Sequence, residues 1–333
     1  DGTTAKPWRT IQGALDLITR DATNGDQVNV KAGTAVVNQA ALTLARYGTP
    51  AEGAPLVIRG YTTAAGDGGI GEIDCNGSSM FASTSLTDIV LAELTIHNFG
   101  NNNGVHITGD RTGMYKCKIH KGASTPSGKA LVYGMRRVVG SWIYSAGASG
   151  YGVYSSGGPI HVLCSYIYNC PIGVYVSVAS SVASKNVVVD CTTGIEVAAD
   201  DCSVFENDLY SSTANTGRAI TSGTGRSNAI FLNNIIEGYS GAGGDAIETG
   251  TGDVFLLGYN AFYNNTNNET LGDVLVDLGG DQALAASPFT DAANGDFSIK
   301  AGSLALEAAW PGAWYGPAAT TAKADMGAVQ AGA

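Results

Sequence analysis

A short pattern occurs twice, 21 residues apart, near the middle of this 333-residue chain. Residues 165–170 read SYIYNC and are followed by Gly173, and residues 186–191 read NVVVDC and are followed by Gly194. Self-similarity at a fixed period indicates a repeat architecture, in which each repeat packs only against its neighbours. This repeat constrains the fold more than any other feature of the sequence.

The repeat extends in both directions and supplies three apolar positions per unit. The second of these positions recurs every 21–27 residues, at Ile96, Ile119, Ile143, Ile167, Val188, Leu209, Ile236 and Phe262. The first position lies five residues earlier, at Leu91, Met114, Val138, Val162, Ala183, Val204, Phe231 and Leu257. The third follows a loop of variable length, at Val105, Leu131, Val153, Val174, Ile195, Ile220 and Ile247. These segments are too short and too β-branched for helices, and a propeller blade needs about 40 residues. Three short strands per unit therefore predict a parallel β-helix.

A column of asparagines accompanies the repeat. The residues two before the second apolar position include Asn186, Asn207, Asn234 and Asn260. Asparagine tolerates the left-handed backbone conformation of tight turns. Stacked asparagine amides can also bond to one another along a column, as in cross-β ladders. The fixed register favours such a ladder over four unrelated turn residues.

The two ends of the chain differ from the repeat. Residues 1–26 predict a capping helix with Ile11, Leu15 and Ile18 on one apolar face, because terminal units of repeat proteins need a cover. Residues 269–333 predict a tail of one or two strands that packs back along the β-helix or closes its C-terminal end. The sequence thus predicts an all-β fold, a single parallel β-helix of about ten coils over residues 27–268 with a helical cap and a tail.

Composition narrows the classes of partner. Only 14% of the residues are charged and 44% are hydrophobic, a balance opposite to that of disordered chains. The net charge of −11 would repel nucleic-acid phosphates, so we expect a polysaccharide or other protein subunits as partners. The sequence contains no apolar run of 18 residues, so we expect no membrane insertion. The chain begins at Asp1 without methionine or signal peptide, which suggests a trimmed product.

Three parts of the sequence carry a resemblance to a known superfamily. The opening reads KPWRTIQGAL over residues 6–15 and GDQVNV over residues 25–30, the middle repeats Asn-x-Ile/Val/Leu, and the ending reads SPF at 287–289, GDFSI at 295–299 and DMGAVQ at 325–330. Together they resemble the pectate-lyase-like right-handed β-helix superfamily over nearly the whole chain. That resemblance implies a right-handed coil. It does not choose between polysaccharide lyases, hydrolases, epimerases, phage tailspikes and catalytically silent surface proteins.

Aromatic residues flank the second apolar position in two neighbouring coils. Trp142, Tyr144, Tyr166 and Tyr168 should point outward, because side chains alternate along a strand and adjacent coils lie about 4.8 Å apart. With Tyr175 they are the predicted ligand-binding residues, since an exposed aromatic patch suits sugar rings or a protein partner. The alternatives are an aromatic ladder that only stabilises the sheet, or a patch covered by the tail.

Two carboxylates stand out next to the third apolar position. Glu196 and Glu248 should point outward two coils apart, which places their backbones roughly 9.6 Å from each other. Inverting glycosidases hold their catalytic carboxyls about 6.5–9.5 Å apart, so Glu196 and Glu248 are the candidate catalytic residues. The alternative is a pair of solvated carboxylates on an exposed face.

Two groups of polar residues are candidate metal ligands, a pair of histidines and a cluster of acidic residues. His97 and His120 should stack in adjacent coils, but no third ligand is evident, so we expect solvated histidines and no metal site. Polysaccharide lyases of the superfamily use an acidic Ca²⁺ cluster with a Lys or Arg base, which makes Ca²⁺ the cofactor to consider if the protein is a lyase. The nearest bases are Lys185 and Arg218, and the acidic residues in that region are Asp190, Asp200, Asp201, Glu206 and Asp208.

Cys170 and Cys191 occupy equivalent positions in adjacent coils. A Cα separation of about 4.8 Å fits a disulfide. Two buried thiols acting as small apolar fillers are the other interpretation.

Two function hypotheses follow. The first is a non-catalytic extracellular or virion-surface protein, such as a phage decoration, fibre or spike element or an adhesin, and trimers are the oligomers that the analogy with viral β-helices suggests. The second is a polysaccharide lyase or glycoside hydrolase that works in a groove along the β-helix. The low charge and the missing catalytic motifs favour the first.

Overall fold

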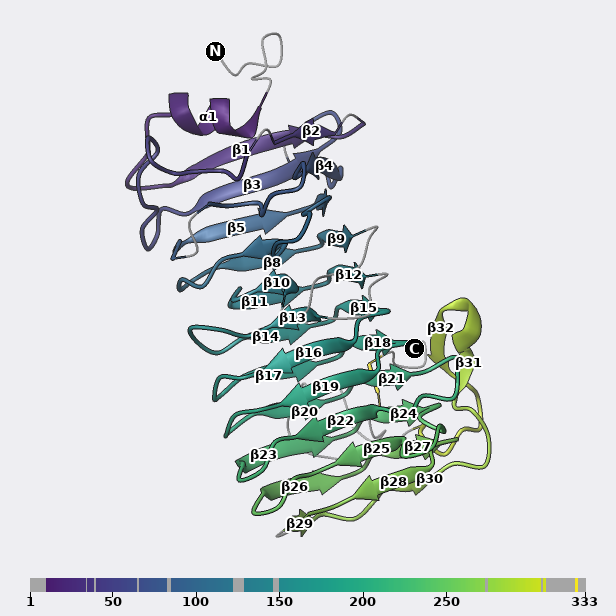
Figure 1. Ribbon diagram of the computed structural model, residues 1–333. Helices are drawn as coiled ribbons and strands as arrows, with labels where there is room; N and C mark the ends of the chain where they lie inside the picture. The colour runs from purple at the N-terminus through teal and green to yellow at the C-terminus, as the bar shows by residue number, and fades with distance from the viewer. Residues whose placement is uncertain are drawn as a thin grey trace, which may run out of the picture. The chain divides into compact units, whose positions relative to one another are not determined.

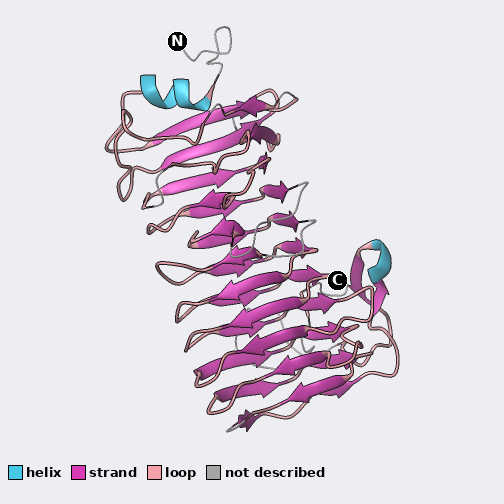
Figure 2. Ribbon diagram, in the orientation of Figure 1, coloured by secondary structure: helices cyan, strands magenta, loops and turns pink. Residues whose placement is uncertain are grey.

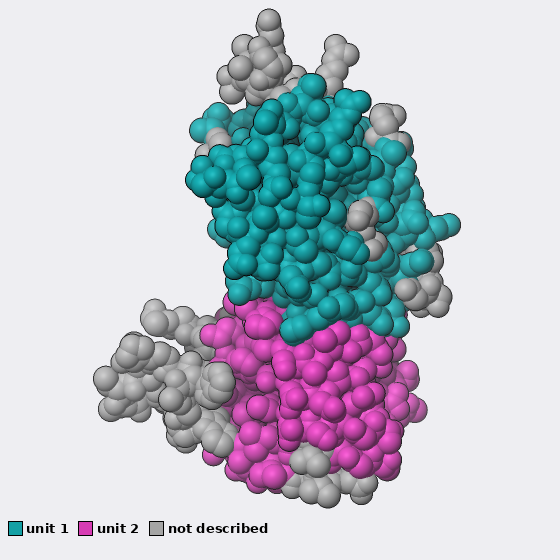
Figure 3. All heavy atoms as spheres, turned by 90° about the vertical axis from the view of Figure 1, so that its left-hand side faces the viewer, with its two compact units in different colours: residues 1–160 teal, residues 161–333 magenta. Residues whose placement is uncertain are grey.

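The computed structural model describes residues 10–33, 35–38, 40–64, 66–82, 85–121, 129–145, 150–272, 275–306, 308–309 and 327–328. The chain divides into two compact units, an N-terminal unit of residues 1–160 and a C-terminal unit of residues 161–333 (Figure 3). The boundary between these two units, after Ile160, lies within the predicted β-helix segment 27–268. The predicted division into residues 1–26, 27–268 and 269–333 stays a prediction.

Strands of the N-terminal unit stack coil upon coil into three parallel sheets (Figure 1). The first sheet contains β1 (Asp26–Lys31), β3 (Leu56–Tyr61), β5 (Ile89–Ala92), β8 (Gly113–Tyr115) and β11 (Arg137–Val139). The second contains β2 (Val36–Val37), β4 (Gly71–Asp74), β6 (Leu94–His97), β9 (Lys118–Lys121) and β12 (Trp142–Ser145). The third contains β7 (Val105–His106), β10 (Ala130–Tyr133) and β13 (Tyr151–Tyr154).

The C-terminal unit repeats the same three-sheet pattern. Its first sheet contains β14 (His161–Leu163), β17 (Val182–Ser184), β20 (Ser203–Phe205), β23 (Ser227–Leu232), β26 (Val254–Gly258) and β29 (Leu275–Asp277). Its second contains β15 (Tyr166–Tyr168), β18 (Val187–Val189), β21 (Asp208–Tyr210), β24 (Ile235–Glu237), β27 (Ala261–Tyr263) and β30 (Gln282–Ala283). Its third contains β16 (Ile172–Val176), β19 (Thr193–Val197), β22 (Arg218–Ser222), β25 (Asp245–Glu248) and β28 (Asn267–Thr270).

The fold is therefore all-β and a parallel β-helix, as the repeat predicts (Figure 2). The coil count is lower than the predicted ten: within the described residues, eight coils carry a strand in all three sheets. The first two coils lack a third-sheet strand, because an isolated bridge between Leu42 and Phe81 takes its place.

Strand register confirms the three apolar positions with one correction. Ile96 pairs with Ile119, and Val188 pairs with Leu209, each fully buried. At the third position of β10, however, Val132 and not Leu131 pairs with Val105. The loop before β10 has a different length from its neighbours, so spacing alone placed this position one residue too early.

The corner between the first and second sheets has a constant geometry. In the eight coils from β5 and β6 to β26 and β27, each of these corners places one residue in the left-handed region, with φ between 51° and 57°, directly before the column that holds the asparagines. These residues are Glu93, Lys116, Gly140, Cys164, Lys185, Glu206, Asn233 and Tyr259. A single left-handed residue turns the chain sharply, which lets one strand follow another after a two-residue corner.

The asparagine ladder is confirmed. Nδ2 of Asn186 donates to Oδ1 of Asn207 over 3.0 Å, Asn207 donates to Asn234 over 3.0 Å, and Asn234 donates to Asn260 over 3.1 Å. All four amides are fully buried. The ladder ends at Asp281, whose Oδ1 accepts the backbone N–H of Asn260.

A short helix covers the start of the N-terminal unit (Figure 1). Helix α1 (Ile11–Leu17) begins after Thr10, whose side chain accepts the backbone N–H of Gly13. Ile11 and Leu15 are buried against the first coil, as the capping interpretation requires. Ile18 is not helical, because its ψ of 128° ends the helix one residue earlier.

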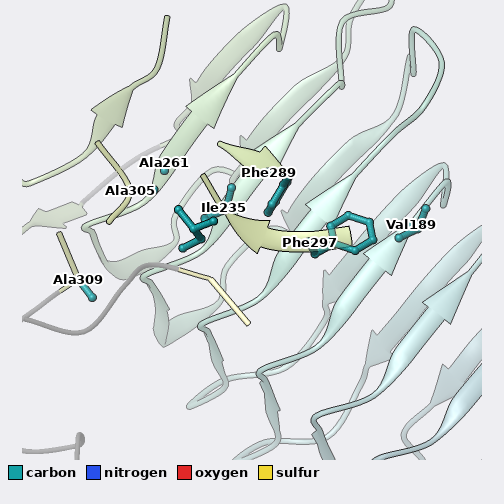
Figure 4. Close-up of a cluster of buried hydrophobic side chains, with 8 residues drawn as sticks. Val189, Ile235, Ala261, Phe289, Phe297, Ala305 and Ala309 are labelled. Carbon is teal, nitrogen blue, oxygen red and sulfur yellow. The ribbon is translucent and has the colours of Figure 1, made fainter. Parts of the chain in front are cut away.

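The described part of the tail packs alongside the C-terminal unit. Strands β31 (Phe289–Asp291) and β32 (Asp296–Ile299) form an antiparallel hairpin around the 3-10 turn η1 (Ala292–Asn294). Figure 4 shows Phe289 and Phe297 of this hairpin in one buried cluster with Val189 and Ile235 of the second sheet. The tail thus returns along the outer face of that sheet, which is one of the two placements that the sequence suggested.

All six cysteines are free thiols, so Cys170 and Cys191 are buried apolar fillers and form no disulfide. Among the described residues, no helix has the length and apolar character needed to cross a bilayer.

Candidate functional site

The outer face of the second sheet in the N-terminal unit combines aromatic and charged side chains. Strand register aligns Thr95, Lys118 and Trp142 in one column running coil by coil. A parallel column aligns His120 with Tyr144. Two of the predicted ligand-binding residues, Trp142 and Tyr144, therefore lie directly beside Lys118 and His120 of the preceding coil.

Trp142 has the most exposed large apolar side chain of this face among the described residues. Its side chain is 59% exposed, although β12 places the adjacent Ile143 completely inside the core. Tyr144 is half-buried and Lys118 is exposed. An indole offers a broad apolar face, which a ligand could contact at this exposure.

Two histidines line the second column of the same face. The rings of His97 and His120 are parallel to within 10°, and their centroids lie 5.2 Å apart. Nε2 of His97 lies 3.0 Å from Oε1 of Glu72 in the coil before it. Burial lowers the pKa of His120, and the neighbouring His97 and Lys118 charges lower it further. His120 is thus an uncharged imidazole at neutral pH, able both to donate and to accept a hydrogen bond.

The tail covers the other half of the predicted aromatic patch. In the C-terminal unit, Tyr166 and Tyr168 pack partly buried against the cluster that contains Phe289 and Phe297. The ring centroids of Tyr166 and Phe297 are 6.4 Å apart, and Tyr210 lies 5.8 Å from the same phenylalanine. These tyrosines have a structural role beneath the tail, which the patch interpretation included as an alternative.

The candidate catalytic carboxylates lie on the third sheet of the C-terminal unit. Register aligns Tyr175, Glu196, Thr221 and Glu248 in one outward column. Burial raises the pKa of Glu196, and the Arg218 charge opposes that increase. Arg218 forms an ion pair with Glu248 through its Nε. One carboxylate of the pair is therefore already neutralised by a protein cation.

The acidic residues expected around a lyase-type Ca²⁺ site serve other purposes. Asp190 accepts hydrogen bonds from the backbone N–H and the hydroxyl of Ser212. Glu206 is buried, and its Oε2 lies 3.4 Å from Nζ of Lys185, which holds the equivalent corner position in the preceding coil. Within the described ranges, no three His, Cys, Asp or Glu side chains are arranged to hold a metal ion. The described acidic residues therefore do not fit a Ca²⁺ cluster.

The third sheet of the N-terminal unit contains an aromatic stack that the sequence pattern did not predict. The rings of Tyr133 and Tyr154 are parallel to within 4° at 4.8 Å, and His106 meets Tyr133 edge-on at 4.4 Å. Placing the apolar position at Leu131 rather than Val132 hid Tyr133 from the outward column. The faces of these two tyrosine rings cover each other, whereas the indole of Trp142 is exposed.

No model of a protein family matches this sequence, and no curated protein matches it.

Proposed function

We propose that this protein is a non-catalytic β-helix of an extracellular or virion surface that binds a glycan through the second sheet of its N-terminal unit. The observation that carries the proposal is the exposed Trp142, which lies in register with Lys118 and next to His120 and Tyr144. Large exposed aromatic side chains bordered by polar groups mark interaction sites. The resemblance to the pectate-lyase-like superfamily, which includes surface and spike proteins, supports the same interpretation.

Sugar rings suit the chemistry of this face. Their C–H groups can lie against the indole of Trp142, while Lys118 and His120 can bond to hydroxyl oxygens. The face is a sheet surface on which successive side chains recur about every 4.8 Å, so a linear polymer can contact several coils. The proposal requires no cofactor.

A hydrolase is the second candidate function, and one observation favours it. Glu196 has a raised pKa, while Glu248 two coils away is paired with Arg218. Divergent environments for two carboxyls are typical of an acid–base pair. The Arg218 ion pair, however, occupies one of the two groups. The described part of the tail packs on the second sheet.

Binding and activity can be tested in one experiment. Wild type and Trp142→Ala are compared on a panel of neutral and anionic polysaccharides, with Leu304→Ala as the matched control because Leu304 is also an exposed apolar side chain. Truncating a central aromatic contact usually costs more than about 1 kcal/mol, so Trp142→Ala should weaken binding roughly tenfold and the control should not.

The same samples are assayed for released sugar, with and without Ca²⁺. Product release that disappears in Glu196→Gln would overturn the non-catalytic proposal in favour of the hydrolase. Absence of binding to every polysaccharide, or equal binding by Trp142→Ala, would overturn the glycan site and leave a protein partner to be sought.

A further inference from the structure

The last coil of the C-terminal unit differs chemically from every coil before it. Register places Glu269 in line with the core residue Ile247, and Asp277 in line with the core residue Leu257. Asp281 takes the place that asparagine holds in the ladder. Three columns that hold apolar or asparagine side chains in the four preceding coils therefore end in carboxyl groups.

This coil also ends the sheets. Strands β28, β29 and β30 are the terminal members of the third, first and second sheets, and no described strand pairs with their outer edges. An exposed strand edge presents backbone N–H and C=O groups that can pair with another chain. The described tail leaves this end and runs back along the second sheet, as Figure 1 shows for β31 and β32.

Apolar side chains are exposed on the same coil. Val276 of β29 is 52% exposed and Leu271 after β28 is 38% exposed. Among the described residues of the C-terminal unit, the one other large apolar side chain with such exposure is Leu304 of the tail. The end of the unit thus combines open backbone edges with exposed apolar surface, the composition of a contact surface.

We propose that the C-terminal coil is a self-association surface, where two copies of this chain meet end to end through β28, β29 and β30, and that Glu269 and Asp281 permit this contact only when they share protons. The opposite end of the chain is unsuited to the role, because α1 already buries Ile11 and Leu15 there. Two identical C-terminal ends form an isologous pair related by a two-fold axis, which closes after two copies.

The acids make this contact depend on pH. The charged groups that act on Glu269 are Asp281 and Asp277, and those that act on Asp281 are Glu269 and Asp277. Burial and the interactions with Asp281 and Asp277 raise the pKa of Glu269 to about 7. Burial and the Asp277 charge also raise the pKa of Asp281, and hydrogen bonds to Asn260 and Glu269 oppose that increase. Two ionised ends repel each other, whereas a protonated carboxyl donates a hydrogen bond to a carboxylate across the contact.

Asp281 is also the group that stops the ladder from continuing. Each asparagine amide accepts from the coil before it and donates to the coil after it. An ionised aspartate accepts from Asn260 but has no proton to donate onward. Protonation supplies that donor at the open end, where the partner's coil would lie.

The test is sedimentation velocity of the full chain at pH 5 and pH 8.5. Wild type should be dimeric at pH 5 and monomeric at pH 8.5. Each dimer takes up two protons, so its Kd should rise about 100-fold per pH unit above the pKa of Glu269. The double variant Glu269→Gln/Asp281→Asn should be dimeric at both pH values.

Two substitutions of Asp277 test whether the outer backbone edge of β29 makes the contact. Leu278 donates its N–H to the preceding coil, so the N–H of Asp277 points to the open edge. Asp277→Asn removes the charge and keeps this donor, while Asp277→Pro removes both and is tolerated on an edge strand. Asp277→Asn should dimerise at least as well as wild type, and Asp277→Pro should stay monomeric at pH 5.

Three results would overturn the proposal. They are a wild type that is monomeric at pH 5, an Asp277→Pro variant that dimerises as Asp277→Asn does, and trimers instead of dimers. Circular dichroism of each variant confirms that the fold is retained. If the double variant fails to fold, the wild-type pH series and the Asp277 pair decide the question on their own.

Discussion

Asn207 is the residue whose replacement measures the asparagine ladder most directly. Its Oδ1 accepts the backbone N–H and the side-chain N–H of Asn186, each over 3.0 Å. Its Nδ2 donates to the carbonyl of Ala183 over 3.0 Å and to Oδ1 of Asn234 over 3.0 Å. Nδ2 also donates to the carbonyl of Phe205 over 3.1 Å. Asn207→Ala removes all five contacts at a position with no exposed surface.

The expected loss follows from what remains buried. Each intramolecular hydrogen bond contributes roughly 1 kcal/mol net, and a buried donor left without an acceptor costs about 1–3 kcal/mol. The backbone N–H of Asn186 becomes such a donor, while its side chain keeps the bond to the carbonyl of Val162. We therefore expect Asn207→Ala to reduce the free energy of unfolding by about 3–5 kcal/mol.

The assay is equilibrium urea unfolding followed by far-UV circular dichroism. Asn294→Ala is the matched control, because Asn294 makes one exposed hydrogen bond to Asp291 and should change stability by less than about 0.5 kcal/mol. The urea midpoint should fall without a change in slope. A loss below about 1 kcal/mol, or a loss equal to that of the control, would show that these asparagines are turn residues whose stacking adds no stability.

Two further predictions concern the tail and the thiols. Burial raises the pKa of Glu237, which accepts a hydrogen bond from Ser287 over 2.8 Å. The stability that the protonated Glu237 contributes is therefore complete below about pH 4.5 and is lost as the pH rises through the raised pKa. Glu237→Gln should have the same Tm as wild type at pH 4 and a higher Tm than wild type at pH 8. A Tm of Glu237→Gln below that of wild type at pH 8 would contradict this reasoning. Cys164 is exposed and the other five cysteines are buried, so a thiol reagent should label one cysteine in the native chain and six after unfolding, whereas four after unfolding would indicate a disulfide.

The coil architecture was predictable because one spacing never varies. Five residues separate the first and second apolar positions in every repeat from Leu91–Ile96 to Leu257–Phe262. That interval reflects a single left-handed residue followed by a buried ladder residue, a geometry with no room for insertion. The third position follows loops of different lengths, and there the sequence misplaced Val132.

The candidate site was only half predictable for a different reason. The alternation along β12 correctly pointed Trp142 and Tyr144 outward, because that pattern is local. The same pattern on β15 gave no sign that Phe289 and Phe297, more than 100 residues later, would lie against Tyr166. Whether an outward side chain meets solvent or another segment depends on long-range packing, which no local period records.

Because the corner between the first and second sheets is the same in eight successive coils, whole coils could be inserted or deleted as units. A block such as residues 165–185 begins at a ladder position and stops just before the next one, at Asn186. Duplicating it would present each added strand with the same neighbours, hydrogen-bond partners and corner that its parent has, and deleting it would rejoin matching surfaces. Gene duplication can therefore change the number of coils one at a time, while the face that carries Trp142 stays unaltered.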